Sequence, residues 1–135
     1  MFTIQIYRDS DVLTGANIAI MNNLFINGWT LYPTLEKLFT EKQNIFYYRI
    51  AIGSLNDEPI CVVIYRDLLD NCLTRETNIN YFANIQAFCK KEHRRKGYTS
   101  QCIIALNPRN DLFVEEGIEG SIEFWNKNGF TNLFE

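Results

Sequence analysis

The clearest pattern along the chain is the recurrence of large hydrophobic residues at every second position, which is typical of β-strands. This pattern runs from residue 2 to residue 7 and again from residue 46 to residue 52. Residues 60–65 are almost continuously hydrophobic, which predicts a strand that is buried on both faces. The stretch 53–59 between these last two segments has the composition of a loop. We therefore expect the two strands to form a hairpin.

Other segments place hydrophobic residues at the three- and four-residue spacing of a helix. The helices are expected at 11–28, capped by Ser10 or Asp11, and at 33–39, 97–106 and 118–125. Further strands are expected at 81–88, at 112–114 and from Gly129 onward. This order predicts a mixed α/β (α+β) layer fold in a single domain spanning residues 1–135, without internal repeats. The strand–helix–strand unit around 97–106 predicts a parallel pair with a ligand at the carboxyl end of its first strand.

Size and composition limit the classes of protein to consider. The chain has 135 residues, of which 47% are hydrophobic, enough for one domain with a real core. Its net charge of -3 argues against a general polyanion binder, so any anion site must be local. The N-terminal segment lacks the pattern of a signal peptide, and no hydrophobic run is long enough to cross a membrane. We therefore expect a cytoplasmic protein without membrane association.

The cysteines give no sign of a metal site or of disulfides. The four of them form no Cys-x-x-Cys pair, and most have hydrophobic neighbours in the sequence: Cys61, Cys72, Cys89 and Cys102. Reduced, packed thiols suit this pattern better than zinc ligands, so no metal is expected. A cysteine nucleophile would need His93, the chain's single histidine, as its base, and the sequence brings that residue to none of the thiols.

The sharpest chemical feature is a basic turn between the strand expected at 81–88 and the helix expected at 97–106. Five of the 13 Lys and Arg residues fall within positions 90–96 of this otherwise acidic chain. The first N–H groups of a helix lack internal partners, and a phosphate can accept their hydrogen bonds. Gly97 would let the backbone approach the phosphate closely. The predicted anion-binding residues are Arg94, Arg95, Lys96, Gly97, Tyr98, Thr99 and Ser100.

Two other interpretations of the basic turn remain open, and one is excluded. The turn could be an ordinary solvated surface loop, although its position between a strand and a helix favours a binding site. It could also contact nucleic acid, but such a patch should be broader and interleaved with exposed aromatic residues, and only Tyr98 offers one here. A Walker-type loop is excluded, because the second glycine followed by Lys and Ser or Thr is absent.

Two motifs in the chain resemble those of the GNAT acyltransferase superfamily. Residues 94–99, Arg-Arg-Lys-Gly-Tyr-Thr, resemble the acetyl-CoA motif Arg/Gln-x-x-Gly-x-Gly/Ala, and residues 124–130, Phe-Trp-Asn-Lys-Asn-Gly-Phe, resemble Phe-Tyr-x-x-x-Gly-Phe. The resemblance implies a central mixed sheet flanked by helices and acetyl-CoA as co-substrate. It further implies that the pantetheine arm lies between two splayed parallel strands and bonds main-chain groups of Phe88 and Cys89. The acceptor amine would attack the thioester carbonyl directly.

The sequence departs from the superfamily pattern in several places. Thr99 stands at the third specified position of the first motif, where the superfamily prefers glycine or alanine. Trp125 stands where relatives often have a tyrosine that protonates the leaving thiolate. An indole cannot serve as that acid, so Trp125 is expected to pack the last helix onto the sheet. The base is assigned to a water held by Asn84 or Gln86, or by Glu76. Glu76 and Gln86 are thus the predicted catalytic residues.

The C-terminal strand is expected to be short, because the sequence given ends five residues after Phe130, where relatives continue into another strand. An open sheet edge invites pairing with another chain, so we expect that a homodimer could form through it.

Three functions follow from these observations. The first is N-acyl transfer from acetyl-CoA to an amine of a small molecule, a peptide or a protein. The second is a non-catalytic CoA-binding protein, or an interaction protein that keeps only the fold. The third, a protein that modifies nucleotides or nucleic acids, is supported by the basic turn alone.

Overall fold

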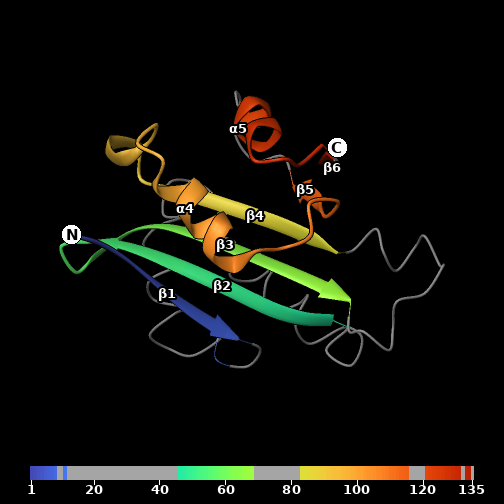
Figure 1. Ribbon diagram of the computed structural model, residues 1–135, viewed down its shortest axis with the longest axis horizontal. Helices are drawn as coiled ribbons and strands as arrows, with labels where there is room; N and C mark the ends of the chain where they lie inside the picture. The colour runs from blue at the N-terminus through green and yellow to red at the C-terminus, as the bar shows by residue number, and fades with distance from the viewer. Residues whose placement is uncertain (9–10, 12–45, 69–82, 116–120, 132, 135) are drawn as a thin grey trace.

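The computed structural model describes residues 1–8, 11, 46–68, 83–115, 121–131 and 133–134. The strands in these residues form one sheet in the order β1-β2-β3-β4-β5-β6 (Figure 1). They are β1 (Phe2–Arg8), β2 (Phe46–Leu55), β3 (Glu58–Leu68), β4 (Asn84–Cys89), β5 (Phe113–Glu115) and β6 (Leu133–Phe134). The helices are the 3-10 helix η3 (Lys91–His93), α4 (Tyr98–Leu106) and α5 (Ser121–Lys127). The two helices expected within 11–39 lie outside the described residues.

The first four strands pair antiparallel, each with its neighbour in the sequence of strands. The predicted hairpin of β2 and β3 is confirmed, but its loop is much shorter than the expected 53–59. The strands meet at a two-residue turn, where Asn56 and Asp57 have φ values of 51° and 68°. Asn and Asp tolerate this left-handed conformation, and two such residues give the turn type that matches the twist of paired strands. A register shift between Gly53 and Ser54 accommodates the polar end of β2 within the ladder.

Helix α4 covers one face of the antiparallel strands and contacts β1, β2, β3 and β4. Cys102 on α4 places its Sγ atom 3.7 Å from Sγ of Cys61 on β3, and Cys61 lies directly opposite Cys89 on β4. Because strand side chains alternate between faces, Cys89 and Ala87 point towards α4, whereas Gln86 and Phe88 lie on the opposite face. The core is built from the middle of β2 and β3 together with inward residues of β4, β5 and the helices: Ile50, Ile52, Ile60, Val62, Val63, Ile85, Leu112, Val114, Trp125 and Phe130.

The last part of the chain forms a parallel unit, as predicted. β5 pairs with β4 at only two positions, Asn84 with Phe113 and Ile85 with Val114. β6 then pairs parallel with β5, and α5 lies between these two strands in the sequence. Residues 86–89 of β4 continue beyond this pairing, still bonded to β3 on their other side. Within the described residues, the pairing of β4 with β5 therefore covers these two positions and does not extend to residues 86–89.

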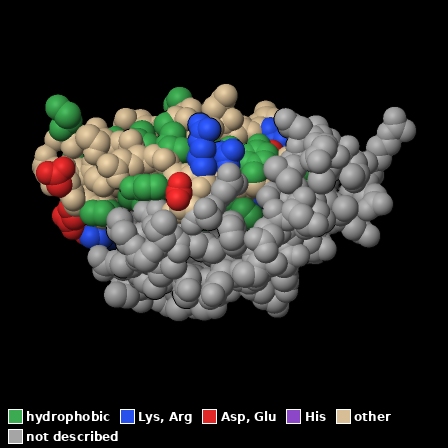
Figure 2. Space-filling model, turned by 90° about the horizontal axis from the view of Figure 1, so that it is seen from below, with side chains coloured by type: hydrophobic (Ala, Val, Ile, Leu, Met, Phe, Trp, Pro, Cys, Tyr) green, Lys and Arg blue, Asp and Glu red, His purple; other side chains and the backbone are tan. Residues whose placement is uncertain are grey.

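Within the part of the chain that the structure describes, no helix is long and apolar enough to cross a membrane. The described portion of the face in Figure 2 carries acidic, basic and hydrophobic side chains close together. A broad basic surface, as expected for a nucleic-acid-binding protein, is not what this described portion presents.

Candidate functional site

A pocket of about 600 Å³ opens where β4 has parted from β5, a volume within the usual range for small-molecule sites. Its walls are the carboxyl end of β4, the basic loop, the first turn of α4 and one side of α5. Eight of the nine residues predicted to bind the cofactor line it: Phe88, Cys89, Arg94, Arg95, Gly97, Tyr98, Thr99 and Ser100. The ninth, Lys96, is an exposed residue of the loop outside that lining. The structure thus gathers the predicted residues in one place.

The loop presents the N-terminus of α4 to this pocket. The first backbone bond within the helix runs from the N–H of Gln101 to the carbonyl of Gly97, at 3.1 Å. The N–H groups of residues 98–100 precede that bond, so they belong to the helix end that has no internal acceptors. Gly97 forms the N-cap with a φ of 83° and provides no side-chain cap, and a Cβ built on it would meet nothing within 4 Å. The side of Gly97 that a Cβ would occupy is therefore open, next to the donors that an anion would use.

Arg94 is held in place beside the pocket. Its Nε donates a hydrogen bond of 2.9 Å to the carbonyl oxygen of Cys89, and its guanidinium lies 5.7 Å from the ring centre of Phe88. One edge of the guanidinium is thus fixed by the main chain and one face by an aromatic ring. The terminal nitrogens are left as donors for a phosphate. Nearby, the Nζ atom of Lys90 lies 3.0 Å from Oε1 of Glu58 at the start of β3, so this cation is paired within the protein.

The thiols near the pocket are held in their protonated form. A hydrogen bond with the Cys102 thiol, together with burial, raises the pKa of Cys61 to about 12. A hydrogen bond with Cys61 and burial raise the pKa of Cys89 above its usual range. The three described cysteines, Cys61, Cys89 and Cys102, are free thiols. A protonated thiol is a poor nucleophile, so this environment argues against cysteine catalysis and suits the packed thiols that were predicted.

Trp125 occupies the packing position expected of it. Only 4% of its surface is exposed, and its ring meets Phe130 edge-on at 5.5 Å and Phe124 at 5.1 Å. The indole therefore anchors α5 on the sheet while one of its edges lines the pocket.

The two predicted catalytic residues are not brought together by the described part of the structure. Gln86 is buried and is not among the residues that line the pocket, although Ala87, Phe88 and Cys89 further along β4 are. Glu76 lies outside the described residues. Neither assignment is therefore tested here, and both stay predictions.

Several pocket residues were not anticipated from the sequence. These are Glu123, Phe124 and Lys127 of α5. His93 of η3, which the sequence places within the basic turn, also lines the pocket, and its ring lies 6.5 Å from that of Tyr98. Glu123 and Lys127 are four residues apart, a spacing that places both on one side of a helix next to the Phe124-Trp125 motif. This four-residue spacing is the feature of the sequence from which Glu123 and Lys127 could have been predicted to line the pocket. Among the residues described, no group of three or more His, Cys, Asp or Glu side chains could hold a metal ion.

The likeness of this chain to known proteins is found in its structure and not in its sequence. No protein-family model matches the chain, and no curated protein matches it in sequence. Among solved structures it is similar to the aminoglycoside acetyltransferase AAC(6')-Iy in complex with a bisubstrate analog, CoA-S-monomethyl-acetylneamine. That similarity has a TM-score of 0.55 at 12% identity and covers 98% of this chain and 94% of that one.

The same enzyme in complex with CoA gives a TM-score of 0.52 at 12% identity, covering 100% of this chain and 92% of that one. At this identity the likeness concerns the fold, and it extends over nearly the full length of both chains. The chain therefore has the fold of the GNAT acyltransferases.

Proposed function

We propose that this protein binds an acyl-CoA, with acetyl-CoA as the expected form, and transfers the acyl group to an amine. The observation that carries the proposal is the pocket at the N-terminus of α4, in which unbonded helix N–H groups, Gly97 and Arg94 converge. A diphosphate matches this set of donors in charge and in geometry. The fold shared with enzymes crystallised on CoA compounds supports the same ligand class.

In this proposal the pyrophosphate of the substrate lies against the N–H groups of residues 98–100. Arg94 and Arg95 add positive charge, and the hydroxyl group of Ser100 can donate a further hydrogen bond, whereas the hydroxyl of Thr99 interacts with the thiols of Cys61 and Cys89. The pantetheine arm would then run along residues 86–89 of β4, whose edge is no longer paired with β5. Its amides can bond the main chain there as a further strand would.

The acyl transfer itself needs a base for the ammonium of the acceptor and a donor for the oxyanion that forms on the thioester carbonyl. We propose that a water held by Gln86 or Glu76 takes this proton and relays it to solvent, from which the departing CoA thiolate takes up a proton in turn. An amide side chain can position such a water but cannot act as a base itself. The acceptor is proposed to be an amine of a small molecule, a peptide or a protein. A cytoplasmic location and a homodimer through a sheet edge remain predictions.

A second candidate is a CoA-binding protein without catalysis. It is favoured by Trp125, which is buried between two aromatic rings at the position where relatives often carry their acid. Such a protein would keep the phosphate site and lack thiol release.

The two candidates are separated by measuring binding and turnover on the same sample. Acetyl-CoA at one hundred times its dissociation constant should stabilise the folded state by about 2.7 kcal/mol, which is readily seen as a shift in melting temperature. Release of the CoA thiol is then followed with a panel of amines. Binding with thiol release supports the enzyme, and binding without it supports the second candidate. If acetyl-CoA, CoA and longer acyl-CoAs at millimolar concentration all leave the melting temperature unchanged, the proposal is wrong.

A further inference from the structure

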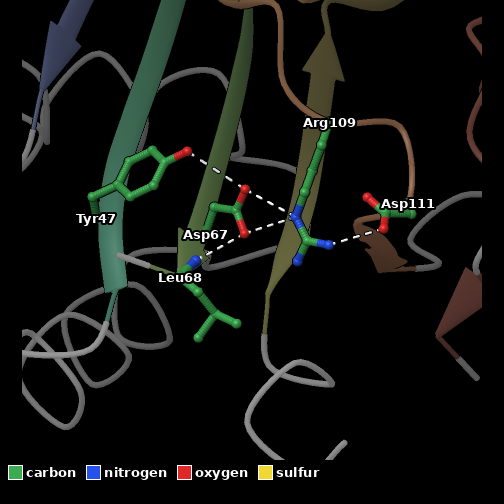
Figure 3. A network of polar contacts seen from close by, with 5 residues as sticks. All are labelled: Tyr47, Asp67, Leu68, Arg109 and Asp111. Atoms are coloured by element: carbon green, nitrogen blue, oxygen red, sulfur yellow. Dashed lines mark hydrogen bonds and ion pairs between the residues drawn. The ribbon is translucent and has the colours of Figure 1, made fainter. Parts of the chain in front are cut away.

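A partly buried ion pair joins the end of β3 to the segment between α4 and β5 (Figure 3). Nε of Arg109 lies 2.9 Å from Oδ1 and 3.0 Å from Oδ2 of Asp67. The backbone N–H of Leu68 donates to the same carboxylate at 2.8 Å, and the hydroxyl of Tyr47 lies 3.4 Å from it. Only 8% of the Asp67 side chain is exposed. A carboxylate so buried is stable only because these donors surround it.

The pair lies where the C-terminal unit joins the rest of the sheet. α4 ends at Asn107, which has a left-handed conformation, and the chain then passes through Arg109 into β5. Arg66, next to Asp67, is opposite Asn84, and Asn84 is the first residue of β4 that pairs with β5. Since β4 and β5 share only two residue pairs, the link from Arg109 to Asp67 is a substantial part of this junction.

The unit held at this junction also forms one wall of the pocket. β5 and β6 pair directly, and Val114 of β5 belongs to the same buried cluster as Trp125 and Phe130. The same cluster also contains Ile85 of β4 and Cys102 of α4, so the core connects α5, which carries Glu123 and Lys127, to β5 and to the opposite side of the junction. The opposite wall belongs to β4 and α4. A shift of β5 at the junction would change the distance between the two walls, because packed elements move together.

We propose that Asp67 and Arg109 are positioning residues: their ion pair fixes β5 against β3 and β4 and so sets the width of the pocket for its phosphate-bearing ligand. The ligand class, a CoA compound, rests on the proposed function, whereas the mechanical link does not. The alternative is that the pair contributes only to stability.

The network contains its own matched control. Arg109 also lies 3.0 Å from Asp111, but the side chain of Asp111 is 60% exposed. An exposed pair of this kind contributes little to stability, whereas removing one partner of a buried pair leaves a charge without compensation. Replacing Asp111 removes an ion pair from the same arginine and leaves the link to Asp67 intact.

Burial, followed by the Asp67 charge, raises the pKa of Tyr47 to about 12, so its hydroxyl remains a donor at neutral pH.

The test compares Asp67→Asn and Arg109→Met with Asp111→Asn. The dissociation constant for CoA is measured by calorimetry at a temperature where circular dichroism shows every variant folded. We expect Asp67→Asn and Arg109→Met each to weaken binding by roughly 3- to 30-fold, the scale of coupling between separated sites. The double variant should bind about as weakly as either single variant, because both changes break the same link. Asp111→Asn should bind like the wild type.

Unchanged affinity in folded Asp67→Asn and Arg109→Met, even with a lower melting temperature, would show that the pair is only structural. If either variant fails to fold, Arg109→Lys replaces it, since it keeps the charge but loses the Nε contact to both carboxylate oxygens. Affinity equal to the wild type in that variant would likewise overturn the proposal.

Failure of the proposed function itself would look different, because the wild type would then not bind CoA. Hydrogen exchange decides the mechanical link in that case. Faster exchange of the α5 and β5 amides in Asp67→Asn than in Asp111→Asn supports it, and equal exchange refutes it.

Discussion

Replacing Gly97 by alanine separates the fold from the proposed phosphate site. The φ of Gly97 is 83°, and a Cβ placed there would meet nothing within 4 Å. In the free protein the cost is therefore limited to the left-handed backbone, about 1–2 kcal/mol. For a chain of this size that corresponds to a melting temperature lower by roughly 4–8 °C. With ligand bound, the new methyl group would occupy the space that the phosphates need. We expect CoA affinity to fall at least about tenfold, or ~1.4 kcal/mol.

Gly129 provides the matched control for this change. Its φ is 90°, and a Cβ there would lie 3.9 Å from Cβ of Asn110, an ordinary contact. Gly129→Ala should therefore lose about as much stability as Gly97→Ala and keep the affinity of the wild type, since Gly129 is not among the residues that line the pocket.

Urea denaturation gives the stability of both variants, and titration calorimetry with CoA gives the affinity. If folded Gly97→Ala binds CoA within about twofold of the wild type, the phosphates do not approach this helix end. An equal loss of affinity in Gly129→Ala would show that backbone strain, and not the pocket, controls binding. Either result would refute the argument from the open space above Gly97.

Three further predictions concern single side chains. Arg94→Ala should weaken CoA binding by about 1.5–3 kcal/mol, the scale of one charged hydrogen bond, and should flatten its salt dependence in calorimetry at two salt concentrations. Trp125→Phe should lower the free energy of unfolding by about 1–2 kcal/mol and leave the acyl transfer rate unchanged, because the indole packs on Phe130. The pKa of Tyr47 is raised from 10 to about 12, so the stability from its protonated hydroxyl is present below pH 10 and lost as the pH rises towards 12. Urea denaturation should therefore show a smaller loss over this range in Tyr47→Phe than in the wild type.

The parts of the fold that the sequence predicted are those encoded in neighbouring residues. The strand expected at 2–7, the hairpin and the helix expected at 97–106 follow from local periodicity. The structure confirms them, with the strand at Phe2–Arg8 and the helix at Tyr98–Leu106. The parallel pair followed from the helix between its strands. The phosphate loop was predictable for the same reason, since its glycine, its charges and the helix start are contiguous.

Features that depend on the register between distant segments were not predicted. The link between Asp67 and Arg109 joins residues 42 positions apart, and no local pattern marks either of them as a partner. Gln86 is a second example. A polar residue in a strand is expected to face solvent or a binding site, but the side chain of Gln86 is buried, and the local sequence does not indicate this. The hairpin loop was overestimated, because Gly53 and Ser54 have loop-like composition but remain in the ladder through a register shift.

The tight turn at Asn56 and Asp57 also bears on the order in which the chain folds. The β2–β3 hairpin brings together residues that are close in sequence, so its formation costs little loop entropy. β4 and β5 are separated in the sequence by a connection that contains the whole of α4. Their parallel pairing is therefore a non-local contact, and such contacts form slowly. We therefore expect the hairpin to be protected early and the pocket to be completed only when the last strands join, which pulse-labelling hydrogen exchange would contradict if β5 amides were protected first. A folding intermediate of this protein would then already contain the β2–β3 hairpin and yet have no binding site.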